Sequence, residues 1–261
     1  MKRTLILAAA TLCLAGRVSA ASVDLTVFLP EMEEAAKPNV TLRADGKMTV
    51  VNPDKTTADQ LILLRGESND VYVELHEAQD KVLIPKDGAG AVRYVHGAQE
   101  AAPCAPEEPV FGSDFTCEDL QPFSAGRYQT SRIVDESAEQ VVVALFPKHS
   151  QYSLVVITFD REKKVPLKTM YYQETFNNLV KMRRDSDHVL VGRRWLPTKV
   201  TMERFGLRST TTLDLRWAQS PNVPPELFDR AYLSRTSNLT WPDLAAPASD
   251  VSAKGPSNEE R

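Results

Sequence analysis

The side chains best suited to chemistry lie close together in residues 111–120. This stretch holds three carboxylates and two hydroxyls: Ser113, Asp114, Thr116, Glu118 and Asp119. The oxygens of Ser113, Asp114 and Thr116 can accept hydrogen bonds from backbone N–H groups two or three residues further on, which favours a capped turn or a short helix. Gly112 permits a turn that a residue with a Cβ would resist, and Thr116 with Asp119 forms a weak capping-box pattern. Asp114 is the candidate acid for catalysis, but capping is the favoured interpretation.

The sequence contains no constellation of nucleophile, base and orienting acid. It lacks a Gly-x-Ser-x-Gly elbow, a Cys-x-x-Cys pair, a phosphate-binding loop and a His-Glu-x-x-His motif. The four histidines are scattered along the chain: His76, His96, His149 and His188. We therefore expect no catalytic residues, no metal and no cofactor, and a hydrolase is the least favoured of the functions considered.

The composition is that of an ordinary soluble globular protein. The chain has 261 residues, 42% of them hydrophobic and 25% charged, with a net charge of −4. It lacks the dense basic run of a nucleic-acid-binding protein, so no nucleic acid is expected as a partner. The basic pairs 183–184 and 193–194 are interpreted as solvated strand ends, with contact to anionic lipid headgroups as the alternative.

The N-terminus has the pattern of an export signal. Lys2 and Arg3 precede an apolar run, residues 5–14, that is short for a membrane span. Small residues at Val18-Ser19-Ala20 predict cleavage after residue 20. The expected organisation is a signal peptide at 1–20, one folded domain at 21–244, and a disordered tail at 245–261 that is rich in Ala, Pro and Ser.

Cleavage of that signal would leave two cysteines, Cys104 and Cys117. An even number of cysteines in an exported protein favours a disulfide. Closing a loop of this length would contribute about 3 kcal/mol in the chain-entropy model. Two buried free thiols are the alternative.

Strand patterns dominate the rest of the chain. Residues 71–75 and 207–217 alternate between apolar and polar side chains, and residues 141–146 and 153–159 are almost continuously apolar. Short strands without alternating helices predict an antiparallel meander. We also expect a strand at 23–27, a hairpin centred on Asp45-Gly46, a helix or strand at 57–64, and a Pro-started helical turn at 224–233. Further strands are expected at 81–85, 91–95, 165–173 and 194–205.

The word Gly112-Ser113-Asp114-Phe115-Thr116-Cys117-Glu118-Asp119-Leu120 closely resembles a known signature. It is the Gly-Ser-Asp-Phe-Thr-Tyr-Glu-Asp-Leu sequence of the LolA-like outer-membrane lipoprotein-sorting family, with Cys117 where that family usually has Tyr. A looser resemblance extends over residues 40–233. We call residues 111–120 the signature loop. A disulfide at Cys117 would explain the change, because a covalent bond could replace an aromatic anchor.

The resemblance implies a mainly β fold: an incomplete, strongly curved antiparallel β-barrel with short helices as a lid over an apolar cavity. It implies a periplasmic carrier that shields acyl chains of lipids or lipoproteins, working with an inner-membrane transporter of the resistance-nodulation-division (RND) type. We expect a monomer. The alternative is a periplasmic lipid-binding sensor that does not transport.

The same resemblance implies that part of the sheet faces a lipid. Both alternating sets of side chains in residues 152–159 are largely apolar, so both faces of that strand should be covered. Which set faces inward depends on register, which the sequence leaves open. We choose Leu154 and Val156, together with Phe115 and Leu120 from the signature loop, as cavity-lining residues.

Overall fold

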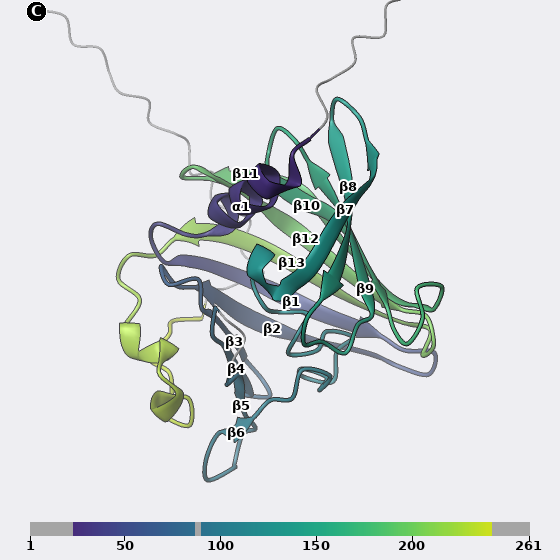
Figure 1. Ribbon diagram of the computed structural model, residues 1–261. Coiled ribbons are helices and arrows are strands. Elements are labelled where there is room, and N and C mark those ends of the chain that lie inside the picture. The colour runs from purple at the N-terminus through teal and green to yellow at the C-terminus, as the bar shows by residue number, and fades with distance from the viewer. Residues whose placement is uncertain (1–22, 87–89, 242–261) are drawn as a thin grey trace, which may run out of the picture.

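The structure is a computed structural model that describes residues 23–86 and 90–241. Within these residues the chain forms one α-helix, α1 (Leu25–Ala36), and thirteen strands in a single antiparallel sheet (Figure 1). The strands are β1 (Leu42–Val51), β2 (Thr56–Arg65), β3 (Val71–Leu75), β4 (Lys81–Ile84), β5 (Val92–Tyr94), β6 (Ala102–Pro103), β7 (Tyr128–Glu136), β8 (Gln140–Pro147), β9 (Leu154–Asp160), β10 (Val165–Tyr172), β11 (Leu179–Val191), β12 (Arg194–Arg204) and β13 (Ser209–Gln219). Three short 3-10 helices are η1 (Ala125–Arg127), η2 (Pro225–Phe228) and η3 (Arg230–Tyr232). The expected signal peptide and tail lie outside the described residues.

The sheet is a half-barrel that does not close. Its strand order is β6-β5-β4-β3-β2-β1-β13-β12-β11-β10-β9-β8-β7, so two meanders meet where β1 pairs with β13, and β6 and β7 are the free edges. The antiparallel meanders agree with the strand pattern of the sequence, and the open, curved barrel is the one that the family resemblance implies. The chain passes from one free edge to the other through residues 104–127, which include the signature loop.

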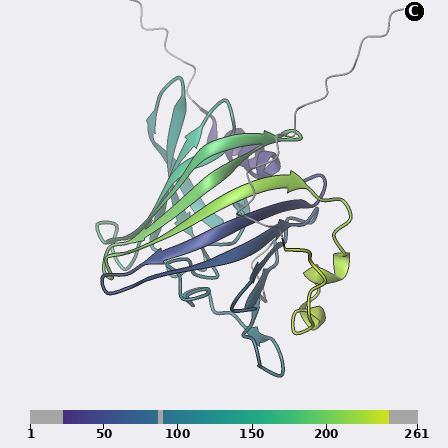
Figure 2. The same ribbon diagram turned by 180° about the vertical axis from the view of Figure 1, so that it is seen from behind.

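Helix α1 lies on the concave side of the sheet. In Figure 1 it is in front of β10, β11 and β12, and from behind the strands cover it (Figure 2). Its side chains Phe28, Leu29 and Met32 are buried, and the ring of Phe28 packs edge-on against that of Phe159 with centroids 5.6 Å apart. The helix therefore closes part of the open side of the half-barrel.

The predicted strand at 23–27 is wrong, because these residues lead into α1. The carboxylate of Asp24 accepts a hydrogen bond from the backbone N–H of Thr26, with N and O 2.9 Å apart, and so caps the helix N-terminus. Pro30 lies within the helix, which continues to Ala36. Alternation over five residues did not reveal a helix whose buried side chains begin at Phe28.

The predicted hairpin at Asp45-Gly46 is also wrong, because β1 runs straight through these residues. A Cβ at Gly46 would lie 2.3 Å from the carbonyl oxygen of Asp214 on β13. The glycine therefore allows two strands to approach closely instead of forming a turn. The turn follows at residues 52–55, and the ambiguous segment 57–64 belongs to strand β2.

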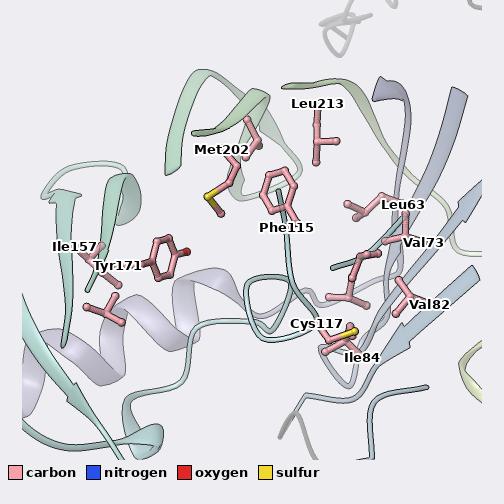
Figure 3. Close-up of a cluster of buried hydrophobic side chains, with 14 of the residues drawn as sticks. Leu63, Val73, Val82, Ile84, Phe115, Cys117, Ile157, Tyr171, Met202 and Leu213 are labelled. Atoms are coloured by element: carbon pink, nitrogen blue, oxygen red, sulfur yellow. The ribbon is translucent and has the colours of Figure 1, made fainter. Parts of the chain in front are cut away.

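The main apolar core fills the concave side, where residues from both meanders meet the signature loop (Figure 3). Two smaller clusters cover the convex side. One lies under the C-terminal segment, where Leu227 and Leu233 pack on β2 to β5; the other is formed by Ala144, Leu154 and Val156. In the described part of the chain, no helix has the length and apolar character that crossing a membrane requires.

Candidate functional site

The signature loop crosses the concave face and is held by a disulfide at Cys117. Cys104 and Cys117 are bonded, with Cα atoms 6.3 Å apart, as the sequence predicts. Cys117 is fully buried and lies beside Ile84 on β4, whereas Phe115 points toward Met202 and Leu213 (Figure 3). The loop thus contacts both meanders from the inside.

Asp114 connects the loop to β13 and does not cap its own turn. Its buried carboxylate accepts hydrogen bonds from the hydroxyls of Ser209 and Thr211, the second at 2.8 Å. The Thr211 hydroxyl in turn accepts from the backbone N–H of Asp114 at 2.9 Å. The local turn is capped instead by Ser113, whose Oγ accepts from the N–H of Phe115 at 3.2 Å. Gly112 has a φ of 65°, which favours glycine.

Asp119 connects the loop to β11 and to the residues before β9. It accepts hydrogen bonds from Lys181 Nζ at 2.8 Å, from the Tyr152 hydroxyl at 2.7 Å and from the backbone N–H of Thr116 at 2.8 Å. The bond from Thr116 is half of the predicted capping box. Burial and the Asp119 charge raise the pKa of Tyr152, so this hydroxyl remains a donor.

Glu118 completes the set of anchors. Its carboxylate accepts hydrogen bonds from the Ser150 hydroxyl and, at 3.2 Å, from the backbone N–H of Gln151, and it lies 3.4 Å from Arg127 Nη2. All three signature acids are thus held by bonds to other segments. Their geometry fits a structural role better than acid–base chemistry.

A cavity of about 230 Å³ lies between the signature loop, the C-terminal end of α1, the ends of strands β2 and β3, and strands β9 to β13. Its walls are mainly aromatic and aliphatic. They include Phe115, Leu120, Phe123, Tyr128, Tyr152, Val155, Ile157, Phe159, Tyr171, Trp195, Leu213 and Trp217. Apolar surface of this kind gains free energy when it is covered by another apolar group instead of water.

The structure places Phe115 and Leu120 in the cavity wall but not Leu154 and Val156. Those two side chains point to the convex face, where they pack with Ala144, and the prediction for them is wrong. Their neighbours Val155 and Ile157 line the cavity instead. Side chains alternate across a strand, so a choice that is off by one residue moves the whole set to the other face.

The cavity wall also contains charged groups. Arg183 forms a two-pronged ion pair with Asp185, with Nε–Oδ1 at 2.7 Å and Nη2–Oδ2 at 3.0 Å. Burial opposes the charge of Arg183, but Asp185 outweighs it and the pKa of Arg183 lies above its usual value. His188 lies in the same wall, and burial lowers its pKa. Among the described residues its Nε2 has no hydrogen-bond partner.

Two arginines hold the C-terminal end of α1 against the sheet. Arg65 Nη2 donates to the carbonyl of Ala36 at 2.8 Å, and Arg194 Nη1 donates to that of Glu34 at 2.9 Å. Cations at a helix C-terminus are favourable because the last carbonyls lack intrahelical partners. Arg65 also lines the cavity, whereas Arg194 does not.

Sequence reasoning did not identify Arg65, Arg183 or His188 as cavity residues. For Arg65 the sequence did offer a signal. It follows directly on the apolar run 61–64, so a cation at this position is expected close to the apolar interior. Arg183 and His188 lie on β11. Most residues in the middle of this strand are charged or polar, so its sequence lacks the regular apolar alternation that predicts a strand. Within residues 23–86 and 90–241, no cluster of His, Cys, Asp and Glu is suited to hold a metal ion.

Solved structures with the same fold include three bacterial proteins. An outer membrane lipoprotein-sorting protein domain from Vibrio parahaemolyticus is 16% identical, with a TM-score of 0.70 over 80% of this chain and 97% of that one. A DUF1329 family protein from Desulfovibrio piger is 17% identical, with a TM-score of 0.67 over 79% of this chain and 96% of that one. A LolA superfamily protein from Nitrosomonas europaea is 14% identical, with a TM-score of 0.64 over 81% of this chain and all of that one.

Two comparisons concern the sequence itself. The search of curated proteins finds no match. Residues 97–235, which run from before the signature loop to beyond η3, match a family described as "Uncharacterized protein". Because this match spans more than half of the chain, the protein belongs to that family, and its fold is the open half-barrel of the LolA-like proteins.

Proposed function

We propose that this protein is a periplasmic carrier that binds an acyl chain of a lipid or lipoprotein in the cavity behind the signature loop. The observation that carries the proposal is the cavity itself: about 230 Å³ of mainly apolar space on the concave side of a half-barrel. Each CH₂ group of an acyl chain costs about 0.8 kcal/mol in water, so a soluble carrier must cover it.

Two further observations support binding without catalysis. The fold is shared with an outer membrane lipoprotein-sorting protein domain from Vibrio parahaemolyticus. The signature acids Asp114, Glu118 and Asp119 each bond to other segments of the chain. A cavity whose nearest acids are already engaged suits a ligand that is held and released unchanged.

The cellular setting is the finer part of the proposal. The export-signal pattern at residues 1–20 supports a periplasmic location, and the resemblance of the signature loop supports an RND-type transporter as partner. Crosslinking in intact cells, followed by mass spectrometry of the captured proteins, tests the second point. Capture of no inner-membrane RND protein would contradict that partnership and leave lipid binding untouched.

The test of acyl binding is a titration of delipidated protein with saturated fatty acids of increasing length, read by displacement of a fluorescent acyl probe. Affinity should rise roughly fourfold per added CH₂ until the cavity is filled, and then level off. Lack of saturable probe binding, or an affinity that ignores chain length, would contradict the proposal.

A further inference from the structure

The charges that line the cavity are almost all paired. Arg183 is bound by Asp185, Arg127 lies 3.4 Å from Glu118, and Lys164 Nζ lies 2.8 Å from Glu31. Asp119 of the same wall is bound by Lys181. Arg65 is different. Among the described residues, no carboxylate lies within salt-bridge distance of its guanidinium, which makes it the uncompensated cation of the wall.

The polar contacts of Arg65 are neutral oxygens. Its Nη2 donates to the Ala36 carbonyl at 2.8 Å and to the Asn69 side chain at 2.6 Å. Asn69 has a left-handed conformation with a φ of 73° and is part of the turn that follows Arg65, where its N–H donates to the carbonyl of Gly66. Both bonds use one nitrogen of the guanidinium, which has five N–H donors in all. The donors on Nε and Nη1 make no hydrogen bond to the described residues, and Arg65 lines the cavity, so these donors can serve a ligand there.

The electrostatic surroundings of Arg65 favour an incoming anion. Burial, together with the nearby cations Arg194 and Arg183, lowers the pKa of Arg65 to about 10. A cation that is desolvated and repelled by its neighbours is stabilised when an opposite charge approaches. Guanidinium groups bind carboxylates and phosphates through two parallel hydrogen bonds, which also fix the orientation of the anion.

We propose that Arg65 binds the anionic end of the occupant, a carboxylate or a phosphate ester attached to an acyl chain that fills the apolar part of the cavity. This inference rests on the proposed function and specifies its ligand class: anionic amphiphiles in preference to neutral ones. Arg183 is not the anchor, because Asp185 already occupies its Nε and Nη2 donors.

Arg65 has a second role that the experiment must separate, because it also holds the end of α1. Arg194 supplies the matched control. It bonds to the carbonyls of Glu34 and Ala35 at the same helix end but does not line the cavity. Replacing Arg194 therefore weakens the helix anchor and leaves the anion site in place. Arg65→Lys gives a further control that keeps the charge.

The experiment compares a fluorescent fatty acid with its methyl ester, which has the same chain but no charge, in wild type, Arg65→Met, Arg65→Lys and Arg194→Met. Wild type should prefer the acid by about tenfold, the scale of a hydrogen bond to a charged group. Arg65→Met should lose this preference, whereas Arg65→Lys and Arg194→Met should retain most of it. Circular dichroism confirms that each variant is folded.

The outcomes separate the inference from the proposed function. If wild type binds acid and ester equally, or if folded Arg65→Met keeps the preference, the anion site is contradicted while acyl binding stands. If wild type binds neither compound, the proposed function itself fails. Inorganic phosphate is added as a competitor. If millimolar phosphate alone displaces the acyl probe, the site binds free anions, and the proposal that its ligand is an anionic amphiphile is contradicted.

Discussion

The Nζ of Lys181 lies 2.8 Å from Oδ2 of Asp119, and the two side chains are 3% and 0% exposed. This buried ion pair joins the signature loop to strand β11, and the Tyr152 hydroxyl completes the coordination of the carboxylate. Removing one partner of such a pair leaves the other charge buried and uncompensated, which is costly. The pair therefore identifies the loop as a structural connector of the half-barrel.

Asp119→Asn should lower the free energy of unfolding by about 3 to 5 kcal/mol, because Lys181 would keep its charge without a carboxylate. Urea unfolding at neutral pH measures this. The control is Glu31→Gln, which breaks the exposed pair with Lys164 and should cost less than about 1 kcal/mol. Similar losses in the two variants would contradict the role assigned to Asp119.

The bond between Cys104 and Cys117 should be present in protein isolated under non-reducing conditions. A thiol titration under denaturing conditions should find both cysteines oxidised, and Cys104→Ala/Cys117→Ala should lose about 3 kcal/mol of stability. Chemical reduction of the wild type should produce a similar loss. Two titratable thiols per chain in freshly isolated protein would contradict this prediction.

Neighbouring valines on β9 test which face of the sheet binds the ligand. Val155 lines the cavity and Val156 packs on the convex face, and both residues are buried. Val→Thr is the same change of one methyl to a hydroxyl at either position, with a cost of about 1 to 3 kcal/mol where the hydroxyl is unsatisfied. Val155→Thr should weaken acyl-probe binding about tenfold, and Val156→Thr should lower stability with affinity unchanged. The reverse result would contradict the assigned register.

His188 should make the protein less stable in mild acid. Burial lowers its pKa in the folded state, against the opposing effects of Asp185, Asp160 and Asp187. As the pH falls below the ordinary histidine value of about 6.5, the unfolded chain takes up the proton first, so unfolding is favoured. As the pH falls from neutral to the lowered pKa of folded His188, the His188→Gln variant should therefore lose less stability than the wild type. Carboxylates titrate in both proteins and cancel in the difference. Parallel pH profiles of the two would contradict the prediction.

The sequence was most informative where one face of a strand is buried and the other is wet. On β13 the alternation correctly places Ser209, Thr211, Leu213 and Leu215 on the buried face, since their neighbours are polar or less buried. It fails only at Leu207, the first residue of the predicted alternating segment, which lies before the strand and is exposed. On β9 both faces are apolar, one against the cavity and one against the convex cluster of Ala144, Leu154 and Val156. Periodicity cannot distinguish two buried faces, so the register had to come from the fold.

The other errors came from contacts between distant residues. Asp45-Gly46 has the composition of a turn, but the close approach of Asp214 on β13 determines what the glycine does. The partners of Asp114 lie about a hundred positions away in sequence, at Ser209 and Thr211, where no local rule would find them. The signature sequence could be recognised from the chain alone. Its role as a connector depends on hydrogen bonds to distant strands, such as β11 and β13.

Photo-crosslinking tests the central claim, that the concave cavity holds an acyl chain, most directly. A fatty acid with a diazirine near the end of its chain is bound to the delipidated protein and irradiated, and the labelled peptides are identified by mass spectrometry. The account predicts labels on cavity residues such as Phe115, Val155 and Ile157. Labelling that excess ordinary fatty acid, added before irradiation, does not prevent would contradict it. Labels on convex residues such as Leu154 and Val156 would contradict it as well.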